Sequence, residues 1–249
     1  MSKAADDLTK ASEKLAHDKE MEVHKHIRGR GLISGIALGL SDGLVTNIAF
    51  LSGFGSATSN IGIIRFAGIA VMLAGSLSMF FGGLLAGRSE TELFRADAAR
   101  EASEIETEPE EERNELKSFY LQKGLTSQEA DIVVKRVTSD KRKWLEDLLT
   151  HELHIHEAEL ENPFKVALAI GLAFLAGAFV PLVPYLILSS KSLALIISIV
   201  LSLIFLFGAG YWKGMIVGRN RAKNAVEMLA IGAFASLLLY AVGTLLVFV

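Results

Sequence analysis

Residues 192–212 read SLALIISIVLSLIFLFGAGYW, a run in which no side chain carries a charge. A helix of this length can cross the ~30 Å hydrocarbon layer of a bilayer, where charged side chains are costly. The depletion of charge extends further, because only Asp42 and Glu227 among the 28 acidic residues lie outside segments 1–30 and 88–162. With 51% hydrophobic residues and a mean hydropathy of +0.40, the sequence excludes an ordinary soluble domain, a disordered chain and a fibrous chain.

Five apolar segments predict an all-α membrane protein with five transmembrane helices. They cover residues 31–53, 61–86, 163–188, 192–212 and 226–249, each long enough to span a bilayer. Without water the backbone must hydrogen-bond internally, so their many glycines do not prevent helix formation. The chain therefore divides into an N-terminal extension (1–30), spans one and two (31–87), an acidic helical insert (88–162) and spans three to five (163–249).

The basic residues at the ends of the spans predict the orientation. With five spans nearly all of them fall on one side, and only Arg65 and Lys191 remain for the other. The positive-inside rule then puts the N-terminal extension and the insert in the cytosol. The extension has no apolar central run, so it does not read as a cleaved signal peptide. Whether it is a surface helix or a solvated tail stays open. We expect a multi-pass protein of the cell membrane, or of the vacuolar membrane in a eukaryotic host.

Turn and capping signals divide the insert into helices. The sequences TEPE at 107–110 and TSQE at 126–129 both have the form of a capping box, which opens a helix. They predict helices over 108–123 and from 127 onward, followed by a third over 140–161. The second membrane helix is expected to continue to about residue 106.

Several kinds of chemistry are excluded by what the sequence lacks. It has no cysteine, so any metal must be held by carboxylate, imidazole or thioether groups. It has no GxxxxGK[ST] loop and no HExxH motif, and it lacks the Glu-x-x-His pairs of di-iron proteins. No basic face favours nucleic-acid binding. We therefore expect no enzyme, no prosthetic cofactor and no nucleic-acid partner.

Asp42 is the only acidic residue deep inside a predicted span. A carboxylate there costs ~2.5–3.5 kcal/mol on insertion scales, and such residues mark ion or proton paths. The alternative is a structural acid paired with a helix end or a lysine. Thr46 adds a hydroxyl one turn later on the same face. Beside it, glycines recur at every fourth position, which suits a pore wall or a dimer seam: Gly31, Gly35, Gly39 and Gly43.

Methionines at helical spacing in the second span have two interpretations. Met72 and Met79 share a face, which is most often a packing pattern. A thioether is also a soft, uncharged ligand for a transition metal.

The insert holds a dense group of carboxylates. Glu101/Glu104 and Glu112/Glu115 are i,i+3 pairs, so two helices folded together would create an oxygen site for a divalent cation. A solvated acidic face is an equally good reading of the same pattern. The predicted third helix adds imidazole and carboxylate groups at helical spacing: His151, Glu152, His154 and Glu157.

Three motifs together resemble the vacuolar iron transporter family. They are DGLVT at 42–46, GSLSM at 75–79 and GLLAGRSE at 83–90. The five-span plan with an insert after the second span is similar as well, as are GAFAS at 232–236 and YAVG at 240–243. The resemblance covers about residues 30–249.

The resemblance implies a homodimeric transporter that exchanges Fe²⁺ for protons. It implies that Asp42 and Met79 line the translocation path and that Glu101, Glu104, Glu112 and Glu115 bind metal. A further metal-binding glutamate corresponds to Glu152, with Glu157 a candidate to complete the site. Glu159, His154 and His156 compete with Glu157 for that last position. Preference among Fe²⁺, Mn²⁺, Co²⁺ and Zn²⁺ is left open.

The resemblance thus implies a secondary transporter that moves Fe²⁺ out of the cytosol in exchange for protons, with Mn²⁺ as a second candidate substrate. The partners are the divalent metal, protons and the lipid bilayer. The main alternative is a membrane-anchored metal sensor or store without transport, and an oxidase of bound Fe²⁺ is a third. An intramembrane aspartate is not needed by a mere anchor, and the missing Glu-x-x-His pairs disfavour the oxidase.

Overall fold

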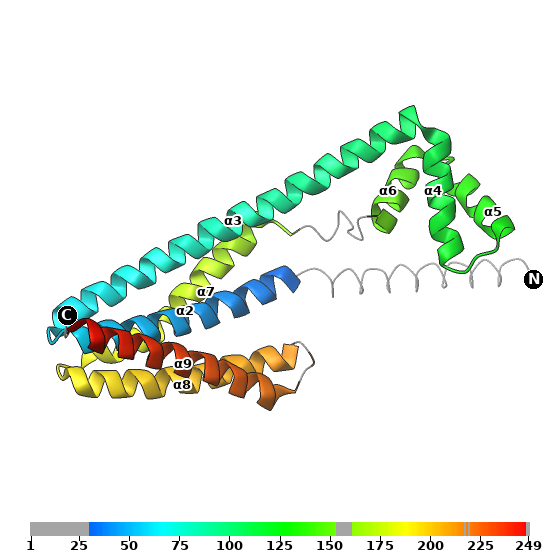
Figure 1. Ribbon diagram of the computed structural model, residues 1–249. Coiled ribbons are helices and arrows are strands. Elements are labelled where there is room, and N and C mark those ends of the chain that lie inside the picture. Colours follow the sequence, from blue (N-terminus) through cyan, green and yellow to red (C-terminus); the bar gives the residue numbers. More distant parts are fainter. Residues whose placement is uncertain (1–29, 153–160, 217, 219, 248–249) are drawn as a thin grey trace, which may run out of the picture. The chain divides into compact units, whose positions relative to one another are not determined.

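The computed structural model describes residues 30–152, 161–216, 218 and 220–247, and within them it contains helices and no strand (Figure 1). The chain divides into two compact units. The membrane unit comprises Gly29–Gly87 and Asn162–Val249, and the acidic unit includes Arg88–Glu161. The helices are α2 (Arg30–Ala57), α3 (Ile61–Thr107), α4 (Pro109–Gln122), α5 (Ser127–Val137), α6 (Lys141–Glu152), α7 (Pro163–Ile187), α8 (Lys191–Ile216) and α9 (Arg221–Val247).

Five of these helices are long and apolar enough to cross a membrane, as predicted. They are α2, α3, α7, α8 and α9, and several extend beyond the apolar segments read from the sequence. Helix α3 runs without interruption from Ile61 to Thr107 and belongs to both units, which confirms the prediction that the second membrane helix continues to about residue 106. It ends just before Pro109, a residue that a helix interior does not tolerate.

Helix α2 is the central element of the membrane unit, where it packs against α7, α8 and α9 (Figure 1). Its contact with α7 is made backbone to backbone. A methyl group added to Gly39 would collide with the carbonyl of Ile170, and one added to Gly43 with the carbonyl of Phe174. Asn47 reinforces the contact by donating from Nδ2 to the carbonyl of Ala178 at 2.5 Å. The close helix approach predicted for this glycine series is therefore confirmed at Gly39 and Gly43, and of the expected pore wall or dimer seam neither applies there, because the neighbour is α7 of the same chain.

Two basic side chains close helix ends in the membrane unit. Arg65 of α3 donates from Nε to the carbonyl of Tyr185 at 2.6 Å and from Nη2 to that of Leu188 at 3.1 Å. Lys191 donates from Nζ to the carbonyl of Thr58 at 2.9 Å. The last carbonyls of a helix lack internal partners and carry partial negative charge, so a cation there is favourable. Arg65 and Lys191 are the two basic residues that the positive-inside argument assigned to the side opposite the N-terminal extension. Their side chains therefore cap the C-terminal ends of α7 and α2.

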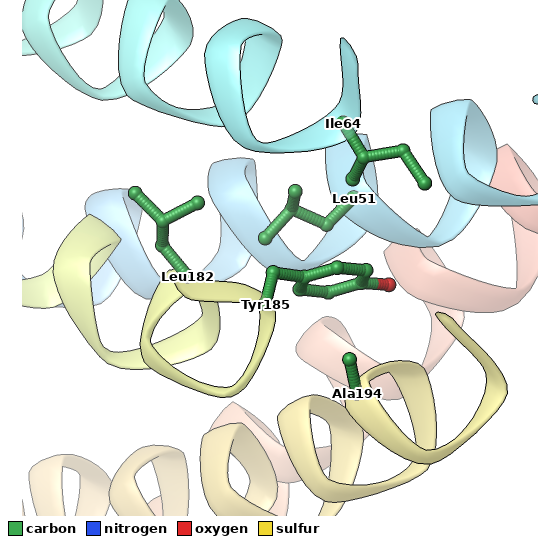
Figure 2. Packing of buried hydrophobic residues seen from close by; sticks show 5 residues of the cluster. All are labelled: Leu51, Ile64, Leu182, Tyr185 and Ala194. Atoms are coloured by element: carbon green, nitrogen blue, oxygen red, sulfur yellow. The ribbon is translucent and has the colours of Figure 1, made fainter. Parts of the chain in front are cut away.

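A buried apolar cluster joins four helices of the membrane unit. It contains Leu51 of α2, Ile64 of α3, Leu182 and Tyr185 of α7, and Ala194 of α8 (Figure 2). Met72 packs against the edge of this cluster, which agrees with the packing interpretation of that methionine. Close packing of side chains, rather than a hydrophobic drive, holds helices together inside a bilayer.

The acidic unit has its own core, formed by the end of α3 together with α4, α5 and α6. Its buried members are Ile105, Leu116, Val134, Trp144 and Leu148. Helix α6 ends at Glu152, and residues 153–160 of the predicted third helix lie outside the described residues.

Of the two predicted capping boxes, one is confirmed and one is wrong. Thr126 and Glu129 form a reciprocal cap at the start of α5, and hydrogen bonds from Thr126 hold the pKa of the Glu129 carboxyl below its usual value. At the other site Thr107 is the last residue of α3, and its hydroxyl donates to the carbonyl of Ser103. The cap residue is Glu108, because Pro109 takes the first helical position, where its missing N–H costs nothing.

Candidate metal sites

The first candidate site is a carboxylate cluster in the acidic unit. Glu101 and Glu104 project from one face of α3, and Glu112 projects from α4 after the turn at Glu108. These three residues can each offer a carboxylate oxygen within 4.8 Å of the other two. Glu101 is 2% exposed and Glu112 is 5% exposed. Such an oxygen-only arrangement suits a divalent cation, since buried carboxylates are costly unless charges of opposite sign compensate them.

A cavity of about 350 Å³ surrounds the cluster and is lined mainly by acidic side chains. Glu115, predicted from its pairing with Glu112, lines this cavity but lies outside the group of three. Glu108 and Glu111 also line the cavity; both belong to the dense group of carboxylates in the sequence, but they were not among the predicted ligands. Their signal was present, because positions 108, 111, 112 and 115 share one helical face. Recognising it required knowing that this face turns toward Glu101.

Among the described residues, Arg100 places a cation against the carboxylate cluster. Arg100 places Nη2 3.1 Å from Oε1 of Glu101 and Nε 3.7 Å from Oε2 of Glu104. The guanidinium therefore offsets part of the mutual repulsion of the carboxylates. A metal ion entering the cluster would compete with Arg100 for the same oxygen atoms.

The core below the cluster holds α4 in place against α6. The guanidinium of Arg113 lies 5.3 Å from the centre of the Trp144 ring. The hydroxyl of Tyr120 donates to Asp147 at 2.6 Å. Burial, reinforced by this hydrogen bond and by the charge of Asp147, raises the pKa of Tyr120 above its usual value, so the phenol remains a donor at neutral pH. These contacts fix the helix that carries Glu112.

The remaining predicted ligands of the acidic unit are not tested. Glu152 is the last residue of α6, but its side chain lies outside what the structure describes. Glu157, Glu159, His154 and His156 lie in the undescribed segment 153–160. Their roles stay predictions.

The second candidate site is a cavity of about 1050 Å³ in the membrane unit. It lies mainly between α2, α8 and α9, at the half of α2 that begins near Gly31. Asp42 lines it and accepts a hydrogen bond from the Thr46 hydroxyl, with Oγ1 and Oδ1 3.3 Å apart. Its other polar and sulfur-bearing lining residues are Ser34, Ser41, Lys213 and Met228.

The two methionines singled out by sequence have different surroundings from Met228. Met79 is partly buried on α3 and is not among the described residues that line the Asp42 cavity. Met72 packs against the apolar cluster around Leu51. The thioether in the cavity is that of Met228, on α9. Its position in sequence, beside the basic connector before the fifth span, gave no sign of proximity to Asp42.

A family model described as the VIT family matches residues 33–244 of the chain. The chain belongs to the VIT family. Two plant proteins named vacuolar iron transporters match over at least nine tenths of their length. Vacuolar iron transporter 1 of Arabidopsis thaliana is 32% identical over 95% of each chain. Vacuolar iron transporter 2 of Oryza sativa is 33% identical over 90% of each chain.

Membership of the VIT family agrees with the resemblance read from the motifs around Asp42 and Met79. The matched region contains Asp42, the carboxylate cluster and all but the outermost residues of the five apolar helices. With five such helices, this VIT family member is a multi-pass membrane protein.

Proposed function

We propose that this chain is a secondary transporter that moves Fe²⁺, and also Mn²⁺, out of the cytosol in exchange for protons. The observation that carries the proposal is a single carboxylate, Asp42, lining a cavity of about 1050 Å³ within the apolar helices. A membrane anchor does not need an acid at this position, which is costly to insert. The names of the relatives, vacuolar iron transporters of plants, support iron as the substrate.

In this proposal Asp42 binds the metal and the proton alternately. One carboxylate cannot be occupied by both, so loading one releases the other, which is the minimum requirement for exchange. The hydroxyl of Thr46, 3.3 Å from the carboxylate, orients the Asp42 oxygen atoms. Met79 supplies a soft contact on the path, and a thioether favours Fe²⁺ over Mg²⁺ or Ca²⁺.

The acidic unit collects metal from the cytosol before translocation. Its cluster of Glu101, Glu104 and Glu112 offers oxygen ligands, with Glu115 in the same cavity. Glu152 and Glu157 complete this cytosolic site. The working unit is a homodimer in the cell membrane, or in the vacuolar membrane of a eukaryotic host. No prosthetic group takes part, and the metal is both substrate and ligand of the acidic unit.

Reconstitution into liposomes tests the proposal. The purified full-length protein is offered Fe²⁺, Mn²⁺, Co²⁺ and Zn²⁺ separately, with and without a pH gradient, and metal entry is followed with an internal fluorescent chelator. We expect Fe²⁺ and Mn²⁺ entry that a pH gradient accelerates, together with metal-driven proton movement. Metal binding without entry of any metal would overturn the proposal in favour of an anchored sensor or store.

A further inference from the structure

A second cavity lies between the same three helices as the Asp42 cavity. It has a volume of about 390 Å³ and is lined by residues of α2, α8 and α9. Its α2 residues are Ile48 and Ser52, in the half of α2 that ends at Ala57, whereas the Asp42 cavity occupies the other half. Most of its lining is aliphatic, and the polar exceptions are Ser52, Ser202, Ser236 and Tyr240. We call it the serine pocket.

Two hydroxyl groups of the serine pocket are buried without a partner. Ser52 is 1% exposed and Ser202 is 0% exposed. Among the residues that the structure describes, neither Oγ atom has a hydrogen-bond partner. Ser236, in contrast, donates to the carbonyl of Gly232 at 2.8 Å. A buried hydroxyl with no partner costs ~1–3 kcal/mol, so a pair of them in one pocket points to a ligand that can hydrogen-bond.

We propose that the serine pocket is a water-binding site, in which water hydrogen-bonds to Ser52 and Ser202. A water molecule occupies ~30 Å³ in the liquid, so the pocket has room for several. A purely aliphatic cavity of this size would stay dry, but the two hydroxyls provide the polar partners that water needs. A lipid chain would fill the volume and leave both hydroxyls unsatisfied.

The serine pocket and the Asp42 cavity are separated by a buried apolar cluster. Leu44, Leu206, Ala209 and Met228 form it. Leu206 lines the serine pocket, and Met228 lines the Asp42 cavity. The cluster thus contributes a wall residue to each cavity and links them through packed apolar side chains. Between Asp42 and Ser52, α2 also carries Asn47, whose Oδ1 is buried without a partner among the described residues.

This arrangement assigns the serine pocket a role in proton movement, a role that rests on the proposed exchange of metal for protons. Water at Ser52 and Ser202 brings protons toward Asp42 from the end of α2 opposite the Asp42 cavity. The apolar cluster interrupts the path of water between the serine pocket and Asp42. A continuous column of water would let protons cross without any exchange for metal. Movement of Leu206 or Met228 is then the step that connects the two cavities.

Thiol labelling tests directly for water in the serine pocket. Because the natural sequence has no cysteine, an introduced cysteine is the only thiol that can react. Ser202→Cys is compared with Ser198→Cys, one turn earlier on α8. Both serines are 0% exposed, but Ser198 donates to the carbonyl of Pro181 at 2.6 Å and does not line the pocket. Each full-length variant in liposomes is treated with a small, charged methanethiosulfonate and analysed by mass spectrometry. Because only a hydrated thiol ionises and reacts, we expect labelling of the Ser202→Cys protein and not of the Ser198→Cys protein.

Ser52→Cys provides a second position on a different helix, so a folding defect in one variant does not decide the result. Equal labelling at 198 and 202 would overturn the proposal, as would no labelling at both 52 and 202. Reaction at 52 and 202 only with an uncharged, lipid-soluble maleimide would show that lipid fills the pocket, and would also overturn it.

The proton role has a separate readout. Because metal and proton movements are coupled in the proposed exchange, the double variant Ser52→Ala, Ser202→Ala should slow Fe²⁺ entry and remove its acceleration by a pH gradient, while its affinity for Mn²⁺ stays at the parent value. An unchanged response to the pH gradient would remove the pocket from the proton route. If the parent protein moves no metal, the proposed function fails, while the labelling result still decides whether the pocket holds water.

Discussion

The two units of this protein manage negative charge in opposite ways. The acidic unit gathers six glutamates around a cavity of about 350 Å³ and adds Arg100 as an internal counter-ion. The membrane unit exposes one carboxylate, Asp42, to a cavity three times larger and supports it with a single hydroxyl. Both can meet a divalent cation, but with very different numbers of ligands.

The difference follows from the surroundings of each unit. In the acidic unit, most of the glutamates around the cavity are at least partly exposed and Arg100 offsets the charge of buried Glu101, so several carboxylates can be kept together, and their number raises affinity for a divalent ion. Among apolar helices each charge is expensive, so one carboxylate is close to the minimum that still binds a cation. Conduction also requires that the ion can leave again. We infer that the acidic unit is built to retain metal and the Asp42 cavity to release it.

Replacing Asp42 by Asn should have the largest effect. The change is nearly isosteric but removes the carboxylate that alternates between metal and proton in the proposed function. We expect transport of every metal to be abolished in liposomes, while the protein remains folded and elutes as the parent does. Ser41→Ala, which changes a neighbouring cavity residue without altering charge, is the control. Transport at the parent rate in the Asn variant would exclude the coupling role.

Neutralising the acidic cluster should have the next largest effect, on metal affinity. Converting Glu101, Glu104, Glu112 and Glu115 to Gln keeps side-chain length and removes four charges. We expect the affinity of the full-length protein for Mn²⁺ to fall by more than tenfold, or ~1.4 kcal/mol, in calorimetry.

The control for that experiment removes the same four charges elsewhere. It changes Glu90, Glu92, Glu110 and Glu146 to Gln, all exposed residues of the acidic unit. An equal loss of affinity in both variants would mean that general negative charge, rather than this cluster, attracts the metal.

Met79→Leu separates thioether chemistry from packing. The exchange conserves volume, so stability should change by less than ~1.5 kcal/mol. We expect a partial loss of transport that is larger for Fe²⁺ and Co²⁺ than for Mn²⁺, which depends more on oxygen ligands. Met72→Leu, whose side chain packs against the cluster around Leu51, is the internal control. Parental transport of all metals by both variants would make Met79 a packing residue.

Arg100→Gln should have the smallest effect and the opposite sign. Removing the cation that occupies the cluster should increase metal affinity by about one and a half- to fivefold, the range that corresponds to the ~0.2–1 kcal/mol of exposed ion pairs. The metal-free protein should also unfold at a lower temperature, because the carboxylates lose their counter-ion. Arg95→Gln, at an exposed position on the same helix, controls for net charge. Weaker binding in the Arg100 variant would show that Arg100 helps to shape the site.

Features encoded locally could be predicted from the sequence. The absence of charge in 192–212 was enough to identify a membrane helix, since span length and composition are local properties. The proximity of Glu101 and Glu112 followed from two helical pairs flanking a proline. The capping box at Thr126 was equally local, and the one at Thr107 failed because the preference of Pro109 for the first helical position decided the cap.

Features that depend on tertiary contacts could not be predicted. Nothing near Met228 in the sequence indicates that α9 brings it to the Asp42 cavity. Gly39 and Gly43 were recognised as a close-packing face, but the spacing cannot say which helix covers it, and the answer is α7. The same limitation concealed Glu108 and Glu111, whose face could be assigned only once α4 was seen beside the end of α3.

The glycine contact between α2 and α7 restricts how the molecule can move. With no side chain between Gly39 or Gly43 and the α7 backbone, the two helices cannot slide or rotate past each other without collision. The same kind of contact joins α2 to α9, because a methyl group added to Gly243 would collide with the carbonyl of Gly53. Helix α2, which carries Asp42, is thus held against α7 in one half and against α9 in the other. Sliding α2 past either neighbour would bring backbone atoms into collision, so these glycine contacts restrain the carboxylate of Asp42 from two directions.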